Sequence, residues 1–163
     1  MENATLIAED PIRDIALLKI NSPRSTKFLT LEYNQVPTGT SCGSLGFPLS
    51  EIIQNQNSIQ FNLIQRFQGS YISSYRKNIL PTGENVNFYE IDSLMYSGSS
   101  GCPGFITNSN VIGMQSQSVL GKGLVKIKKP VSKNVTPDTQ LAISLWVPSM
   151  DIITFAKNNK IQV

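Results

Sequence analysis

Short runs in which apolar residues recur at about every second position, separated by turn-forming clusters, restrict the fold of this chain more than any other feature. Such runs indicate β-strands, because successive side chains of a strand point to opposite faces. We expect strands at 4–8, 15–20, 41–47, 58–67, 86–91 and 140–147, and a hairpin over 103–118. The strand at 58–67 is expected to continue through 71–73 after a bulge at Gly69. The pattern therefore predicts an all-β fold.

One helix is expected near the carboxyl end, over residues 149–158. Ser149 is expected to cap its amino end, since a serine hydroxyl can accept a hydrogen bond from a free amide of the first turn. Asp151 in the first turn and Lys157 in the last both suit the helix dipole. Two long loops are expected, at 21–39 and 121–139.

Composition excludes several classes of function. No apolar run approaches the length of about 18 residues that a membrane-spanning helix needs, and the first residues lack the pattern of a secretory signal. The basic run at 122–129 has no interleaved aromatic residues, so we expect a solvated hairpin and no nucleic-acid site. We expect a soluble, cytoplasmic protein that binds neither membranes nor nucleic acid.

Cysteine and histidine content limits the chemistry further. The two cysteines, Cys42 and Cys102, lie far apart in the sequence, and we expect two free thiols, in keeping with a reducing compartment. The chain contains no histidine, which excludes any histidine metal site. We expect no metal and no organic cofactor.

The stretch YSGSSGCPGF, residues 96–105, is the strongest chemical signal in the sequence. Acyl transfer needs a nucleophile, a base, and donors for the developing oxyanion. A serine in a tight glycine turn supplies two of these parts, because glycine lets backbone amides converge on one point. The amides of Gly98 and Ser100 are candidates for such a pair, beside the Ser100 hydroxyl. The same string also occurs in ordinary loops.

Three more stretches accompany the serine loop in order: DIALLKI at 14–20, GSLGFP at 43–48 and VIGMQSQS at 111–118. Together the four resemble the trypsin/chymotrypsin-like serine peptidases, above all the disulfide-poor kind such as the high-temperature-requirement proteases. The resemblance covers nearly the whole chain. It implies a fold of two β-barrels with the site between them, and hydrolysis of peptide bonds through an acyl-enzyme without a cofactor.

The resemblance also assigns roles to single residues. Ser100 corresponds to the nucleophile, and Gly98 and Ser100 to the oxyanion-hole donors. Asp14 corresponds to the acid that orients the catalytic histidine. Because Asp14 directly precedes an apolar strand, we expect its carboxylate to be partly buried and hydrogen-bonded.

Four further positions correspond to substrate-binding residues of the family. Ser116 falls where a serine hydrogen-bonds the acid, and Gln117 and Ser118 lie on the strand that pairs with an extended polypeptide substrate. Leu94 falls at the base of the specificity pocket, which predicts a preference for an apolar or small side chain at the cleavage site.

The missing histidine is the main departure from the family. Lys19 as an alternative base is disfavoured, because a lysine base needs burial, and Cys102 does not occupy the nucleophile position. In another serine protease, loss of the histidine alone costs about a millionfold in turnover. We therefore expect this chain alone to be nearly inactive.

The resemblance divides the chain into two unequal parts. Residues 1–37 correspond to the last two strands of the first barrel plus an interdomain linker, and 38–163 to a complete second barrel with a terminal helix. We expect Met1 to be a late start, with a missing N-terminal segment supplying the histidine. Two hypotheses remain open: a fragment of a trypsin-like serine endopeptidase, and a non-catalytic pseudopeptidase that binds extended peptides or partner proteins.

Overall fold

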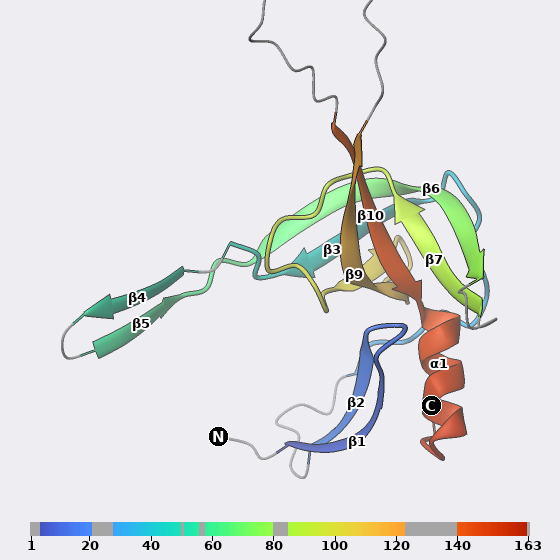
Figure 1. The fold of residues 1–163 in the computed structure, drawn as a ribbon, viewed down its shortest axis with the longest axis horizontal. Helices are drawn as coiled ribbons and strands as arrows, with labels where there is room; N and C mark the ends of the chain where they lie inside the picture. Colours follow the sequence, from blue (N-terminus) through green and yellow to red (C-terminus); the bar gives the residue numbers. More distant parts are fainter. Residues whose placement is uncertain are drawn as a thin grey trace, which may run out of the picture.

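The computed structural model describes residues 4–20, 28–49, 51–55, 58–79, 85–122 and 140–162. Within these ranges the chain forms one closed β-barrel, two separate two-stranded sheets and one helix (Figure 1). The prediction of an all-β fold with one terminal helix is confirmed. None of the described segments forms a helix long and apolar enough to cross a membrane.

Six strands close the barrel in the order β10-β7-β6-β3-β8-β9, and every neighbouring pair is antiparallel. Their bounds are β3 (Ser41–Gly46), β6 (Arg66–Ile79), β7 (Asn85–Ile91), β8 (Pro103–Ile106), β9 (Val111–Lys122) and β10 (Gln140–Pro148). Strand β7 buries side chains on both faces: Tyr89 and Ile91 belong to one buried cluster, and Val86 and Phe88 belong to another. Closure pairs the strands where they run side by side, but β9 is longer than β8 and pairs with it only as far as Met114.

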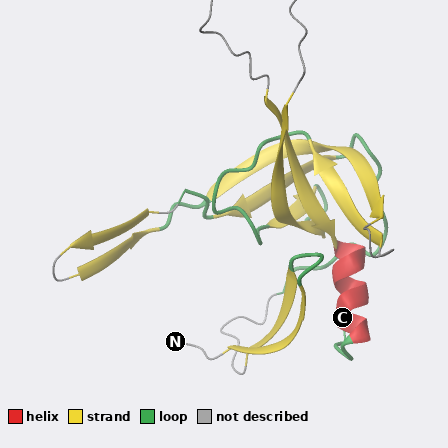
Figure 2. Ribbon diagram, in the orientation of Figure 1, coloured by secondary structure: helices red, strands yellow, loops and turns green. Residues whose placement is uncertain are grey.

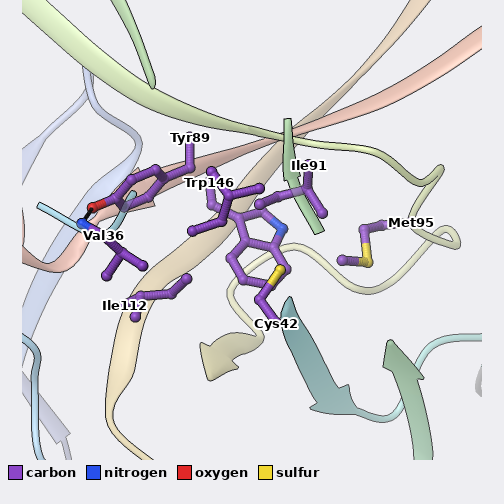
Figure 3. Packing of buried hydrophobic residues seen from close by; sticks show 8 residues of the cluster. Val36, Cys42, Tyr89, Ile91, Met95, Ile112 and Trp146 are labelled. Carbon is purple, nitrogen blue, oxygen red and sulfur yellow. Dashed lines mark hydrogen bonds between the residues drawn. The ribbon is translucent and has the colours of Figure 1, made fainter. Parts of the chain in front are cut away.

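The barrel interior is built around Trp146 of β10, which is completely buried (Figure 3). Cys42, Ile91 and Ile112 pack with it from three other strands. The hydroxyl of Tyr89 belongs to the same core and accepts a hydrogen bond of 2.8 Å from the buried amide of Val36. This bond satisfies two buried polar groups at once, so the segment before β3 is fixed to the barrel.

The segment preceding Val36 also lies along the barrel. Leu31 forms an isolated bridge with Val111 at the start of β9, and the Glu32 amide donates to the Val111 carbonyl at 2.8 Å. Part of the stretch expected as an interdomain linker is therefore in contact with the second barrel. The boundary at residue 37 stays a prediction.

Strands β1 (Ala4–Asp10) and β2 (Ile15–Ile20) pair only with each other and form a ribbon outside the barrel (Figure 2). The apolar side chains of this ribbon are largely in solvent: Leu6 is 54% exposed and Leu18 is 60% exposed. The expectation that this pair has exposed apolar faces is confirmed. Its outer backbone edges are unpaired among the described residues.

A second ribbon, β4 (Glu51–Asn55) with β5 (Ser58–Asn62), extends away from the barrel (Figure 1). The sequence pattern missed β4, and the prediction of one strand over 58–67 is wrong. Leu63 and Ile64 are both exposed, so the alternation breaks there and β6 begins anew at Arg66. The bulge of β6 lies between Ile72 and Ser74 rather than at Gly69.

Helix α1 (Ser149–Asn158) has the predicted bounds. Ser149 is nevertheless not its N-cap: that position is Pro148, which supplies no side-chain capping bond. The Ser149 hydroxyl instead donates to the Glu32 carbonyl at 2.6 Å, so a tertiary contact uses the group that was expected to cap. Asp151 and Lys157 lie in the first and last turns as predicted. The basic run at 122–129 lies almost wholly outside the described residues.

Candidate active site

The serine loop connects β7 to β8, and its shape depends on two glycines. Gly98 has φ of 87° and Gly101 has φ of 82°, values that residues other than glycine rarely adopt. These two residues enclose Ser99, which is buried, and Ser100, which is exposed. The loop therefore turns one serine inward and presents the other to solvent.

Backbone hydrogen bonds alternate along this turn. The Ser99 amide donates to the Tyr96 carbonyl at 3.0 Å, and the Gly101 amide donates to the Gln115 carbonyl at 2.8 Å. No hydrogen bond from the Gly98 or Ser100 amide is found among the described residues. Two unpartnered amides on either side of an inward-turned residue are the donors an oxyanion hole requires.

The loop is also fastened to β9. The Gln115 amide donates to the Cys102 carbonyl at 3.0 Å, which complements the bond from Gly101 to Gln115. The Ser100 hydroxyl donates to the carbonyl of Ser116, one residue further on, at 3.3 Å. At this length the bond is weak, so the hydroxyl remains able to turn toward another acceptor.

Ser116 links the serine loop to the β1–β2 ribbon. Its hydroxyl donates to Oδ2 of Asp14 at 3.1 Å, across 102 positions of sequence. Asp14 lies at the turn between β1 and β2, in the left-handed region with φ of 57°, a conformation that aspartate tolerates better than most residues. The structure thus brings Ser100, Ser116 and Asp14 to one place.

Asp14 itself is exposed, so the expectation of a partly buried carboxylate is wrong. The reason is that most of β2 is exposed as well, with only Ile15 buried near the turn. A recess of about 220 Å³ lies at this turn. It is lined by Glu9, Asp10, Pro11, Asp14, Ile15 and Ala16. Lys19, the alternative base, is exposed on β2.

Gln117 and Ser118 are exposed on β9 and pair with Leu145 and Ser144 of β10. On its other side, β9 pairs with β8 only as far as Met114. Among the described residues, no strand occupies the edge of β9 at Gln117 and Ser118. This edge is accessible to an added strand.

The expected specificity residue, Leu94, precedes Gly98 by four positions and is 39% exposed. Its carbonyl accepts a hydrogen bond of 2.7 Å from Nε2 of Gln68 on β6. This contact could not be predicted from the sequence, because a single polar residue in a strand forms no motif. The role of Leu94 in specificity stays a prediction.

Among the described residues, no three His, Cys, Asp or Glu side chains come together in a group that would hold a metal ion. Both cysteines are free. Cys42 lies opposite Ile106 in the β3–β8 pair. Ile106 follows Cys102 by four residues, so the two cysteines are not opposite each other. Burial raises the pKa of the Cys42 thiol to about 11.

We predict that a thiol reagent modifies Cys102 at least tenfold faster than Cys42 at pH 8 in the folded protein. Cys42 is 5% exposed, and a pKa of about 11 leaves only about one thiol in a thousand ionised at that pH. The measurement is mass-spectrometric mapping of iodoacetamide adducts over time. In urea both cysteines are exposed and should react at similar rates. If Cys42 and Cys102 also react at equal rates in the folded protein, the buried placement of Cys42 is contradicted.

A closed antiparallel six-stranded barrel, a separate β-sheet that carries a carboxylate to the serine loop, and a terminal helix define a chymotrypsin-like fold of the protease type. The model of the trypsin-like peptidase domain matches residues 1–114, from the first ribbon through the serine loop and into β9. The chain belongs to the trypsin-like peptidase domain family. A search of curated proteins found no match.

Proposed function

We propose that the chain carries the nucleophile, acid and oxyanion hole of a serine endopeptidase. The observation that supports this most is the hydrogen-bonded series from Ser100 through Ser116 to Asp14, beside two unpartnered amides at Gly98 and Ser100. A nucleophile, an orienting acid and oxyanion donors in one place form the recurring arrangement of serine hydrolysis.

Each residue has a step in the reaction. The Ser100 oxygen attacks the carbonyl carbon of the scissile peptide while its proton passes to a base, and the carbonyl oxygen becomes an oxyanion that the two amides stabilise. The C–N bond then breaks, the base returns the proton to the leaving amine, and water hydrolyses the acyl ester of Ser100. Asp14 orients the protonated base, with its own orientation held by the Ser116 hydroxyl.

The base is the part this chain does not contain, since its sequence has no histidine. We propose that a further β-segment, N-terminal to these residues in the parent protein, covers the β1–β2 ribbon and brings a histidine to the recess at Asp14. The exposed apolar side chains and unpaired edges of the ribbon support this, because a lone two-stranded ribbon is marginal in water. The chain alone is then nearly inactive.

A second function, the binding of an extended peptide without cleavage, is favoured by one observation. The edge of β9 at Gln117 and Ser118 is exposed and unpaired within the described part of the chain. Backbone pairing at such an edge needs neither the nucleophile nor a base. The two functions share the edge of β9 as the place where the peptide binds, and they differ only in whether Ser100 reacts.

A fluorophosphonate probe tests the nucleophile directly. We predict slow covalent labelling confined to Ser100, complete loss in Ser100→Ala, and unchanged labelling in Ser97→Ala. Ser97 is the matched control, because it is an exposed serine of the same loop. The adduct is located by mass spectrometry.

Labelling spread over several serines, or equal in Ser100→Ala, would overturn the catalytic proposal. Peptide binding that survives in Ser100→Ala, together with no labelling of the unaltered chain, would instead support the binding function.

A further inference from the structure

The serine loop is held by side chains of two barrel strands, β10 and β6. Ser144 of β10 binds the first residues of the loop. The Met95 amide donates to Oγ of Ser144 at 3.0 Å, and the Ser144 hydroxyl donates to the Ser93 carbonyl at 2.6 Å. Ser144 is completely buried, so this attachment is fixed by the core. The other attachment depends on side chains of β6.

Gln68 is the first of these β6 side chains. Its Nε2 donates to the Leu94 carbonyl at 2.7 Å, a short bond that joins β6 to the loop directly. The Oε1 atom of the same amide is buried and has no hydrogen-bond partner among the described residues. Leaving a buried oxygen without a hydrogen bond costs stability. The side chain of Gln68 nevertheless keeps this orientation, and the hydrogen bond from Nε2 to the Leu94 carbonyl explains why.

Arg66 lies two residues earlier on β6 and therefore on the same face of the strand. Its Nη1 donates to the Pro48 carbonyl. The next residue, Leu49, donates its amide to the Ser97 carbonyl at 3.1 Å. Pro48 and Leu49 also adjoin Gly98: their backbone atoms lie 3.7 and 3.6 Å from where a Cβ on Gly98 would stand.

These contacts meet around a recess of only about 10 Å³, which is about the space of one water molecule. Gln68, Arg66 and the buried Ser99 are among the residues that line it. The recess is too small to admit a substrate side chain, so the polar groups of β6 serve the loop itself. They reach it at Leu94 and, through residues 48–49, at Ser97, immediately before the free amide of Gly98.

We propose that Gln68 is a positioning residue: its bond to Leu94, with Arg66 supporting the same loop through Pro48, holds residues 94–98 so that the Gly98 and Ser100 amides stay free for an oxyanion. This deepens, and rests on, the proposed peptidase function. Gln68 does not touch the reacting atoms and acts only through the loop.

Gln68→Glu is the sharpest test, because it keeps the size of the side chain and replaces the donor that faces the Leu94 carbonyl with an acceptor. Ser70→Ala is the matched control, since Ser70 is the next residue on the same face of β6 and also carries a buried, unpartnered oxygen. We expect Gln68→Glu to shift the NMR signals of the Gly98 and Ser100 amides, and Ser70→Ala to leave them in place.

The same variants are compared in fluorophosphonate labelling of Ser100. We expect Gln68→Glu to lower the maximal labelling rate about tenfold while the half-saturating probe concentration changes little, because loss of one oxyanion donor costs a hundredfold or more and displacement costs less. Unchanged amide signals, or a labelling loss matched by Ser70→Ala, would overturn the positioning role. Absence of labelling in the unaltered chain even when imidazole is added as a base would overturn the peptidase function, while the amide signals still decide the role of Gln68.

Discussion

Replacing Gly104 with alanine should lower the free energy of unfolding by about 3 kcal/mol, the upper range of the cost of overpacking a core. Gly104 lies in β8, and a Cβ there would stand 1.9 Å from Cζ3 of Trp146. The indole cannot move aside, since Trp146 is 0% exposed and forms the centre of the barrel core. The measurement is urea unfolding followed by tryptophan fluorescence and circular dichroism.

Gly69→Ala is the control for this prediction. Gly69 is exposed on β6, and an added Cβ would meet only Cε1 of Phe67, at an ordinary contact distance of 3.5 Å. We expect a change within about 0.5 kcal/mol, as for most surface substitutions. If Gly104→Ala does not fold, the same substitution in a Trp146→Leu background should cost less, because the two sites are in contact. In that background unfolding is followed by circular dichroism alone, since Trp146 is the single tryptophan of the sequence. Equal costs for Gly104→Ala and Gly69→Ala would contradict the close packing of β8 on the indole.

Added imidazole should accelerate the fluorophosphonate labelling of Ser100 by at least about tenfold. A positioned general base contributes a hundredfold to ten-thousandfold, and a free base recovers part of this because its ordering is not provided in advance. The recess of about 220 Å³ beside Asp14 is large enough for the ring. The acceleration should grow as the pH rises through the pKa of imidazole, near 7, because only the neutral ring accepts a proton.

N-methylimidazole is the matched control for this rescue. It keeps a nitrogen that can accept the Ser100 proton and lacks the N–H that would donate to Asp14. We expect it to rescue less well than imidazole, and we expect Asp14→Asn to narrow the difference. Equal rescue by the two compounds would show that the base acts from bulk solution and that Asp14 orients nothing. Acceleration in Ser100→Ala would show that the labelled residue is not Ser100.

Much of the barrel could be predicted from the sequence, because its strands carry short apolar runs that are bounded by turn-forming residues. The runs at 41–47, 86–91 and 140–147 match β3, β7 and β10 closely. Strand β5 lies within the run predicted at 58–67, but its pairing with β4 was not predicted. The ribbon does not pair with the barrel, and the alternation of apolar residues continues past the end of β5, so the sequence did not mark where β5 ends and β6 begins.

The candidate site was predictable where the backbone demands a residue type. Gly98 and Gly101 need positive φ, and the sequence shows them as a glycine-framed serine. The contacts of Gln68 and Ser144 with the loop were not predictable, because each is a single polar side chain that reaches a carbonyl or amide distant in sequence. Such contacts depend on the register of the closed barrel, which no local pattern encodes.

The turn at Asp14 has a consequence for how the acid of this site can change by mutation. With φ of 57°, its backbone favours Gly, Asn and Asp, and a longer acid such as Glu would add about 1–2 kcal/mol of strain. Of the three tolerated residues, only Asp ionises. The backbone conformation at position 14 thus restricts which residue types can occupy it. A variant that loses the negative charge but keeps the turn will carry Asn or Gly.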